Sequence, residues 1–476
     1  MTIPLIDPLP RLHQLQTMDL PVHGGRTLAY VFDSGMPDVD EIGTAAVAAY
    51  AGSNGLDPTA FPSLLQMENE LVGMAAELVD APESAVGTVT SGGTESVLLA
   101  VVTARDSRPD IKHPNMVIPS TAHACFHKAA HYFGVEKKVI QVGPDFRADP
   151  AAMAAAIDEN TVLVVGSAPS YAHGVIDPIP QIAAIAKAAG VRCHVDACIG
   201  GWVLAFAPRL GRQVTPWTFA VDGVTSISLD THKYGYAPKG TSVLMHRTSE
   251  LRLPQFTANA SWPGYTVINS TIQSTKSGGP LAGAWAVSQA IGIDGYTKLS
   301  GEVFAGVDAM VAAIDAHPHL HLITHPDSSL VVVGTDDLLD PFSLCDAMMQ
   351  RGWFIQAQPS YAGLPATIHM TISAGTLQHI DEFLAALDDA VDECIAAGPI
   401  KIDPGLAAMV ASIDADSLTG EQFAGLLAAA NLMGPGGGMP ERMGPVNALL
   451  DIAAPPVREK ILILFMDLLT HPVRPV

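Results

Sequence analysis

Short apolar runs alternate with longer amphipathic stretches between Phe61 and about Ser300. The runs have the length and residue types of strands, and the stretches between them have the periodicity of helices. This alternation is typical of a mostly parallel sheet covered by helices on both faces, so we expect an α/β fold. The predicted strands are Met116–Ile118, Val139–Val142, Val162–Gly166, Arg192–Val195, Thr225–Leu229 and Gly240–His246, and the helices include Ala151–Ile157 and Ile179–Ala189.

The same pattern divides the chain into three parts. Residues 1–60 are rich in Pro, Gly and Asp and predict an irregular N-terminal arm with one helix. Residues 61–300 form the predicted large domain. Residues 301–476 predict a smaller α+β domain that ends in a helical tail. Its expected elements are a strand at Ser329–Val333, a long helix at Ile380–Ala397 and a loop at Gly434–Gly438.

Composition and charge limit the classes of protein to which this chain can belong. Apolar residues make up 48% of its 476 residues and charged residues 15%, which excludes global disorder. The 25 Lys and Arg residues against 48 Asp and Glu residues leave a formal net charge of −23. We therefore expect neither a nucleic-acid partner nor binding to an anionic membrane surface.

Other patterns bear on location and on metal binding. No run of about 18 apolar residues occurs, so no membrane span is expected. The first residues show neither a basic nor an apolar leader region, which argues against secretion. The five cysteines are scattered and form no Cys-x-x-Cys pair, so neither disulfides nor a metal site is expected. A cytoplasmic location in a reducing compartment fits these features best.

The segment Thr90–Val97 places two glycines directly before an apolar helical run. A helix start presents unpaired backbone N–H groups and the positive end of the helix dipole, which suits a phosphate. Gly93 and Thr94 are therefore candidate phosphate-binding residues, although glycine-rich turns before helices are common. Neither the spacing of a nucleotide-triphosphate loop nor that of a dinucleotide fingerprint is present.

Asp196 ends an otherwise apolar predicted strand. Ligands gather at the carboxyl ends of strands in open α/β sheets. An isolated carboxylate in such a segment is costly to bury without a partner. Asp196 is then either a helix cap or part of a buried ion pair, or it is an anion that faces a protonated ring nitrogen.

Lys233 follows another predicted strand and lies in a polar, aromatic loop that also contains Lys239. A lysine in a desolvated setting has a lowered pKa and can form a Schiff base with an aldehyde. Most single lysines are solvated surface residues. Two lysines within one short loop of a chain so poor in cations make this loop a candidate site.

The phosphate-binding turn, the acid and the lysine together describe a site for pyridoxal 5′-phosphate. This cofactor needs donors for its phosphate, an acid for its ring nitrogen and a lysine for its aldehyde. A fourth feature fits between them in the chain: His123 follows the strand Met116–Ile118, and its imidazole could stack on the pyridine ring. Alone, that histidine would be read as an ordinary loop residue.

These motifs resemble the group II pyridoxal-phosphate-dependent decarboxylase family, from about His23 to Ile395. The resemblance implies a large domain of the fold type I transferase class, with a mostly parallel sheet of seven strands, and a smaller α+β C-terminal domain. The matching segments are GTVTSGGTESVLLA (87–100), STAHACFHKAAHYFGV (120–135), HGVIDPIP (173–180), HVDACIGGW (194–202) and GVTSISLDTHKYGYAPKG (223–240).

The resemblance also implies roles for individual cofactor-binding residues. Lys233 would form the Schiff base with the cofactor aldehyde. Asp196 would pair with the ring nitrogen, and His123 would stack on the ring. His232 would bind the cofactor phosphate together with Gly93 and Thr94.

Further residues match family positions at the substrate and between subunits. Lys239 and Tyr30 would face the substrate, and Tyr171 would line the same cavity and is a candidate base. Ser277 and Gly278 match a loop that reaches the cofactor phosphate from the partner subunit, which implies a homodimer with composite sites.

Three functions stay open. Within the family, the chain looks most like the carbon–carbon lyases that cleave a phosphorylated long-chain β-hydroxy amine to an aldehyde and phosphoethanolamine. Asp57 stands where those lyases carry a histidine linked to the substrate phosphate, and Lys276 stands where an arginine is frequent, so an amino-acid decarboxylase is the first alternative. The second is a homologue that binds the cofactor without turnover.

Overall fold

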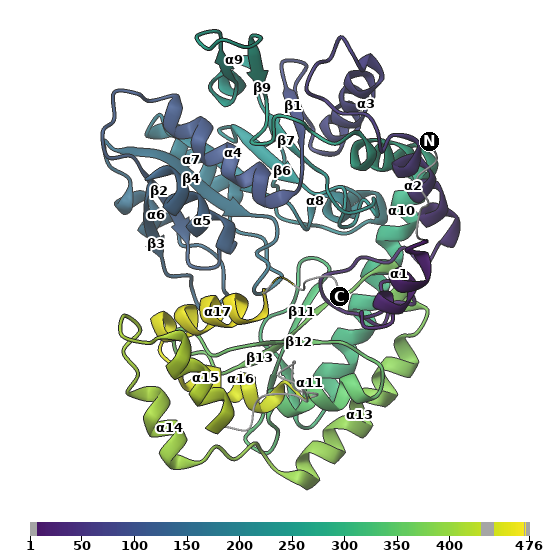
Figure 1. The fold of residues 1–476 in the computed structure, drawn as a ribbon, viewed down its shortest axis with the longest axis vertical. Helices are drawn as coiled ribbons and strands as arrows, with labels where there is room; N and C mark the ends of the chain where they lie inside the picture. Colours follow the sequence, from purple (N-terminus) through teal and green to yellow (C-terminus); the bar gives the residue numbers. More distant parts are fainter. Residues whose placement is uncertain (1–6, 430–441, 471, 473–476) are drawn as a thin grey trace. The chain divides into compact units, whose positions relative to one another are not determined.

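The computed structural model of the chain describes residues 7–429, 442–470 and 472 (Figure 1). The loop expected at Gly434–Gly438 lies outside these residues. The chain forms two compact units, each with its own sheet. The described residues of unit 1 fall in 1–171, 176–306 and 372–379, and those of unit 2 fall in 172–175, 307–371 and 380–476.

Unit 1 contains a seven-stranded sheet with the order β1-β7-β6-β5-β4-β2-β3. Strands β3, β2, β4, β5 and β6 run parallel, and β7 is antiparallel to both of its neighbours. The predicted mostly parallel sheet is therefore confirmed. The strands are β1 (Val86–Thr90), β2 (Asn115–Pro119), β3 (Glu136–Ile140), β4 (Thr161–Ser167), β5 (Arg192–Asp196), β6 (Ser226–Leu229) and β7 (Ser242–His246).

Helices cover this sheet, and a small hairpin of β8 (Thr257–Asn259) and β9 (Val267–Asn269) extends from it. The long α10 is interrupted at Gly292, whose φ of 62° is left-handed. The helices of unit 1 are α1 (Leu9–Gln16), α2 (Pro37–Ala49), α3 (Pro62–Leu78), α4 (Gly93–Asp106), α5 (Ala124–Phe133), α6 (Pro150–Ala156), α7 (Ile179–Ala188), α8 (Gly201–Leu204), α9 (Ser249–Arg252), most of α10 (Gly278–Ala316) and α12 (Ala374–Leu377), with 3-10 turns at Ala207–Leu210 and Leu253–Gln255.

The central strand β4 shows how the sheet positions the site. All of its residues are buried, because α4 packs on one face and α7 on the other. A Cβ at Gly166 would lie 2.6 Å from Ile179 of α7, so Gly166 faces that helix. Side chains alternate along a strand, so Val165 and Ser167 face α4. Ser167 is the last residue of β4, and its side chain therefore lies where α4 begins.

One predicted strand is displaced in the structure. The run expected at Val139–Val142 is β3, which spans Glu136–Ile140 at the edge of the sheet. Its first residues are exposed and charged, because an edge strand has one uncovered side. The apolar pattern therefore marked only the end of this strand.

Unit 2 contains a four-stranded antiparallel sheet with the order β10-β11-β13-β12. The predicted strand near residue 330 and the predicted long helix are confirmed as β11 and α13. Within the described residues, no helix is long and apolar enough to cross a membrane. The elements are β10 (Leu320–Leu322), β11 (Leu330–Thr335), β12 (Gln356–Gln358), β13 (Thr367–Thr371), α11 (Pro341–Gln350), α13 (Ile380–Ala397), α14 (Pro404–Ala411), α15 (Gly420–Ala429), α16 (Gly444–Ile452) and α17 (Pro455–Leu469).

A buried carboxylate anchors the N-terminal segment of unit 1. Asp33 is 5% exposed, and its two oxygens accept hydrogen bonds from the backbone N–H groups of Gly25 and Gly35, each at 2.9 Å. Its backbone carbonyl accepts a further bond from Gly375 N at 2.9 Å. These contacts hold residues 25–35 against the 372–379 segment of the same unit, and they fix the loop that carries Tyr30.

Candidate active site

A cavity of about 330 Å³ lies in unit 1 at the carboxyl ends of β4, β5 and β6. Parallel strands bring these ends to one edge of the sheet, which is where ligands bind in open α/β folds. The lining residues come from segments 91–95, 123–125, 167–171, 196–199 and 230–233.

Most of the residues that the sequence singles out meet at this cavity. Tyr30, Lys239, Ser277 and Gly278 are not among the residues that line it. Those that do line it are Gly93, Thr94, His123, Tyr171, Asp196, His232 and Lys233.

Two glycines bring the start of α4 close to the cavity floor. Gly92 has a φ of 150°, a conformation that residues with side chains rarely adopt. A Cβ at Gly93 would lie 2.7 Å from an oxygen of Asp230 and 2.9 Å from Cys198 Sγ. Only glycine therefore lets this helix start lie so close to Asp230 and Cys198. Its backbone N–H groups then lie at the cavity, where they could bind a phosphate.

The first turn of α4 also carries a carboxylate that the sequence did not single out. Glu95 is 6% exposed and accepts hydrogen bonds from Ser91 N at 2.6 Å and from Ile272 N at 2.8 Å. These backbone donors stabilise the buried charge. Glu95 thereby ties the glycine turn before α4 to the segment that leads to Ser277.

Asp196 ends β5 and is 8% exposed. Its Oδ1 accepts a hydrogen bond from Cys198 N at 3.1 Å, so the residue does stabilise the following turn. It is also paired in register with Ser167 of β4 and Ser228 of β6. The three side chains therefore lie side by side on the face of the sheet under α4.

Ser167 is a polar side chain of the cavity wall that the sequence did not reveal. It is 2% exposed, and its Oγ makes no hydrogen bond within the part of the chain that the structure describes. An unsatisfied buried hydroxyl is costly, so its place beside Asp196 indicates a site for a polar ligand. Asp177 holds this wall by accepting a hydrogen bond from Ser167 N at 2.8 Å.

Lys233 forms an ion pair with Asp230, its Nζ lying 3.0 Å from Oδ2. Burial is the largest single influence and lowers the pKa of Lys233. Asp230, with smaller contributions from Cys198 and Asp196, more than offsets burial and leaves the pKa above the ordinary value. The lowered pKa expected from the sequence is therefore wrong for the chain alone. The sequence argument overlooked Asp230, although this residue stands three positions before Lys233 in the quoted motif.

His232 lies between the carboxylate of Asp230 and the residues that lead into β7. Its Nδ1 accepts hydrogen bonds from Gly240 N at 3.3 Å and Thr241 N at 3.1 Å, so the ring proton resides on Nε2. That nitrogen lies 3.5 Å from Asp230 Oδ2. Burial lowers the pKa of His232, which favours the neutral ring.

His123 caps α5 and faces the cavity. Its Nδ1 accepts a hydrogen bond from Cys125 N at 3.3 Å, which fixes the plane of the ring. The ring of Tyr171 stands edge-on to it, with centroids 6.3 Å apart. Burial lowers the pKa of His123, so the imidazole presents a neutral aromatic face.

Lys239 is held beside His232 and Tyr30. Its Nζ donates hydrogen bonds to the backbone carbonyls of Tyr30 at 3.1 Å and His232 at 3.2 Å. It also lies 4.8 Å from the centre of the Phe32 ring. Burial lowers the pKa of Lys239 to about 8.

Ser277 and Gly278 pack against the N-terminal segment. Ser277 forms a bridge with Asn54, and Gly278 N donates to Ser53 O at 2.9 Å. The adjacent Lys276 is paired with Glu68 at 2.6 Å. Within this chain, the loop therefore lies apart from the cavity that holds Lys233.

Asp57 accepts hydrogen bonds within its own turn. Its Oδ1 accepts hydrogen bonds from Thr59 N at 2.8 Å and from Thr59 Oγ1 at 2.6 Å. The bonds from Thr59 lower the pKa of Asp57, and the side chain is exposed. Asp57 therefore stabilises the turn before α3.

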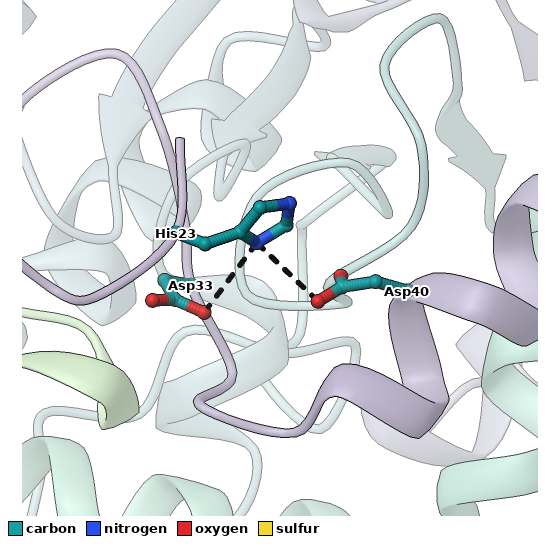
Figure 2. A group of neighbouring side chains, drawn as sticks. All are labelled: His23, Asp33 and Asp40. Carbon is teal, nitrogen blue, oxygen red and sulfur yellow. Dashed lines mark ion pairs between the residues drawn. The ribbon is translucent and has the colours of Figure 1, made fainter. Parts of the chain in front are cut away.

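One group of His and Asp side chains in the described residues has ligand atoms close enough together for a metal ion: His23, Asp33 and Asp40 (Figure 2). His23 Nδ1 lies 3.3 Å from Asp40 and 3.9 Å from Asp33. Both oxygens of Asp33 already accept backbone hydrogen bonds. These contacts explain the group as part of the N-terminal anchor.

The cavity residues fit pyridoxal 5′-phosphate. The volume lies in the range of about 300–1,000 Å³ that is typical of small-ligand pockets. The glycine turn of α4 offers N–H donors for a phosphate, Asp196 offers a carboxylate, and Lys233 offers a primary amine. The unsatisfied hydroxyl of Ser167 adds a donor beside Asp196.

Comparison with known families gives two matches. Residues 32–334 match the pyridoxal-dependent decarboxylase conserved domain. Residues 404–468, which run from α14 into α17, match a family described as "Pyridoxal-dependent enzyme, C-terminal putative HTH domain".

Individual relatives point in the same direction. The sphingosine-1-phosphate lyase of Arabidopsis thaliana is 40% identical over 373 residues, which is 76% of this chain and 67% of that protein. A protein of Methanothermobacter thermautotrophicus that is named "Probable L-tyrosine/L-aspartate decarboxylase" is 29% identical, over 71% of this chain and 90% of that protein. The chain spans about two thirds of the length of the plant and rat lyases that it matches.

A solved structure extends the likeness to three dimensions. The sphingosine-1-phosphate lyase of Burkholderia pseudomallei K96243 superimposes with a TM-score of 0.77 and 31% identity. The match covers 83% of this chain and 93% of that one.

Proposed function

Because the chain belongs to the pyridoxal-dependent decarboxylase family, we propose that it is a carbon–carbon lyase that uses pyridoxal 5′-phosphate. Its substrate would be a phosphorylated β-hydroxy amine such as sphingosine 1-phosphate. Cleavage of the Cα–Cβ bond would yield a long-chain aldehyde and phosphoethanolamine. The observation that carries this proposal is the 40% identity to a lyase over 76% of the chain, against 29% to a decarboxylase.

The cavity residues would hold the cofactor in the way that their positions suggest. The N–H groups of Gly93 and Thr94 would bind the phosphate, and Asp196 would keep the ring nitrogen protonated through its opposite charge. Lys233 would hold the aldehyde carbon, and the neutral face of His123 would pack against the ring. When bound, pyridoxal 5′-phosphate supplies an electron sink for the bond that breaks at Cα.

Residues around the cavity would move the protons of the reaction. Tyr171 would accept the proton of the substrate β-hydroxyl, which Cα–Cβ cleavage requires. Lys233, whose pKa is raised by Asp230, would return a proton to Cα of the product. Lys239 would bind the substrate phosphate as a cation. Lys276 is engaged by Glu68, so Lys239 is the better placed of the two lysines.

The test is incubation of the cofactor-loaded chain with sphingosine 1-phosphate, with mass spectrometry of the aldehyde and phosphoethanolamine. Absence of both products from a loaded, folded chain would overturn the proposal. Lys233→Ala is expected to lose product formation and the cofactor absorbance band that depends on a covalent link. A Lys233→Ala chain with an unchanged band would refute the role of this lysine.

Decarboxylation of an amino acid is the second candidate. The observation that favours it is the share of each relative that the match spans. The match spans 90% of the archaeal protein but 67% of the plant lyase. Carbon dioxide release from tyrosine or aspartate, without aldehyde from sphingosine 1-phosphate, would establish it. The base at Tyr171 would then be dispensable, because loss of a carboxylate needs no proton acceptor.

We further propose a homodimer in which Ser277 and Gly278 reach the cofactor phosphate of the partner subunit. These residues lie outside the cavity of their own chain, which supports this arrangement. An apolar stripe on α1 also lacks burial within the chain, with Leu9, Leu12 and Leu15 exposed by 54%, 50% and 42%. Analytical ultracentrifugation tests the dimer, and a monomer that is fully active would refute composite sites.

We also propose a cytoplasmic location. All five cysteines are free thiols, as a reducing compartment allows. Cell fractionation tests this proposal.

A further inference from the structure

Asp230 is a buried carboxylate in the lining of the cavity, and none of the cofactor groups considered above calls for it. It follows β6 directly and is 1% exposed. Its Oδ2 lies 3.0 Å from Lys233 Nζ and 3.5 Å from His232 Nε2. One carboxylate oxygen therefore faces both the reactive amine and the neighbouring imidazole.

The lysine is the partner that can neutralise this charge. His232 Nδ1 accepts two backbone hydrogen bonds, so a second proton on that ring would break them. The imidazole can therefore donate to Asp230 only as a neutral group. A carboxylate that is 1% exposed without a cation is strongly disfavoured, so Asp230 and Lys233 stabilise each other's charged forms.

We propose that Asp230 holds Lys233 as an ammonium whenever that nitrogen is not joined to the cofactor, and so positions it for amine exchange. This inference rests on the proposed pyridoxal-dependent function. In the exchange, the incoming amine forms a double bond to the aldehyde carbon while the double bond from that carbon to Lys233 breaks. Two protons pass from the incoming ammonium nitrogen to Lys233, which leaves as an ammonium, so total charge is conserved. Asp230 supplies the counter-charge where the new ammonium appears.

Two groups near the end of β5 act on Lys233 in the same direction as Asp230. At the end of β5, Asp196 and Cys198 also raise the pKa of Lys233, although less than Asp230 does. Burial would raise the pKa of Asp230, but Lys233 and His232 lower it, and the net shift is downward. Lys239 opposes a charged Lys233, because two cations repel each other, whereas His123 and Cys125 are further titratable groups near the pair. The positive end of α4 also faces the carboxylate.

The substitution that separates charge from shape is Asp230→Asn. The amide keeps the size of the side chain and an oxygen acceptor, but it removes the counter-ion. Burial then dominates at Lys233 and lowers its pKa below the ordinary lysine value. The matched control is Asp222→Asn, because Asp222 pairs with Lys187 on the exposed surface and its loss leaves the cavity unchanged.

The primary measurement uses the chain without cofactor. Trace acetylation over a pH series, with mass spectrometry of the Lys233 peptide, gives the pKa of this amine directly. In the wild type we expect a value above the ordinary lysine value of about 10.4. In Asp230→Asn, labelling of Lys233 near neutral pH should rise by at least about tenfold, the ratio of one pKa unit. Asp222→Asn should leave it unchanged.

A wild-type Lys233 with an ordinary or lowered pKa would overturn the proposal, whether or not the variant folds. Equal labelling in the wild type and a folded Asp230→Asn chain would do the same. A second measurement follows the absorbance of the cofactor-loaded chain after addition of methylamine, and exchange should slow in Asp230→Asn. Failure of the wild type to bind cofactor would refute the proposed function, and the labelling experiment would still decide the role of Asp230.

Discussion

The protonation state of Lys239 predicts how activity on a phosphorylated substrate depends on pH. Its Nζ is fixed by the carbonyls of Tyr30 and His232 and lies over the ring of Phe32. Burial lowers its pKa to about 8, the positive charge of Lys233 lowers it further, and Asp230 opposes both. A lysine with this pKa is an ammonium below about pH 8 and loses its charge above it.

The size of the effect follows from this value. The charged fraction of Lys239 falls from about nine tenths at about pH 7 to about one tenth at about pH 9. If the ammonium binds the substrate phosphate, kcat/KM for the phosphorylated amine should fall about tenfold across this range, relative to the unphosphorylated analogue. The ratio of the two substrates removes every pH effect that they share, including titration of the substrate amine.

The assay measures both substrates from about pH 7 to about pH 9 in the wild type and in Lys239→Arg. Arginine keeps its charge over the whole range, so the variant should show a flat ratio. A wild-type ratio that stays constant with pH would refute the assignment of Lys239 to the substrate phosphate. A ratio that falls equally in both proteins would assign the titration to a different group.

Two further predictions concern residues that shape the cavity wall. Gly93→Ala places a Cβ 2.7 Å from Asp230, so a fluorescence titration should show cofactor binding weakened by at least about tenfold, or about 1.4 kcal/mol. The control is Gly73→Ala on α3, where a Cβ meets nothing within 4 Å, and it should leave binding unchanged. Asp177→Ala leaves the buried N–H groups of Ser167 and Ala148 without their acceptor, so urea unfolding should show a loss of about 2–5 kcal/mol, and an unaltered midpoint would contradict this reasoning.

The large sheet could be predicted because its strands are buried on both faces. Val162–Gly166 is a continuous apolar run for that reason, and the structure extends it by only one residue at each end, as β4. The prediction misplaced β3 because its first three residues, Glu136–Lys138, are charged and resemble a loop, and the first two of them are exposed. Periodicity detects covered strands well and edge strands poorly.

The sequence predicts a site residue well where one residue type is required for one chemical role. Lys233 for the Schiff base and Asp196 for the ring nitrogen are such cases. Asp230 is not, because its role depends on a 3.0 Å contact that sequence spacing alone does not specify. The local role of Asp57 was equally hidden, because its hydrogen bonds from Thr59 are a property of the turn that the motif does not specify.

Unit 1 is discontinuous, and this has a consequence for its synthesis. Residues 372–379 complete it, with Ile372 O accepting a hydrogen bond from Tyr234 OH at 2.6 Å and Gly375 N bonding to Asp33 O. A ribosome must therefore release the intervening residues 307–371, which belong to unit 2, before unit 1 can close. During that interval the loop that carries Lys233 lacks the hydrogen bond from Tyr234 to Ile372, so a nascent chain that stalls there should bind the cofactor less tightly.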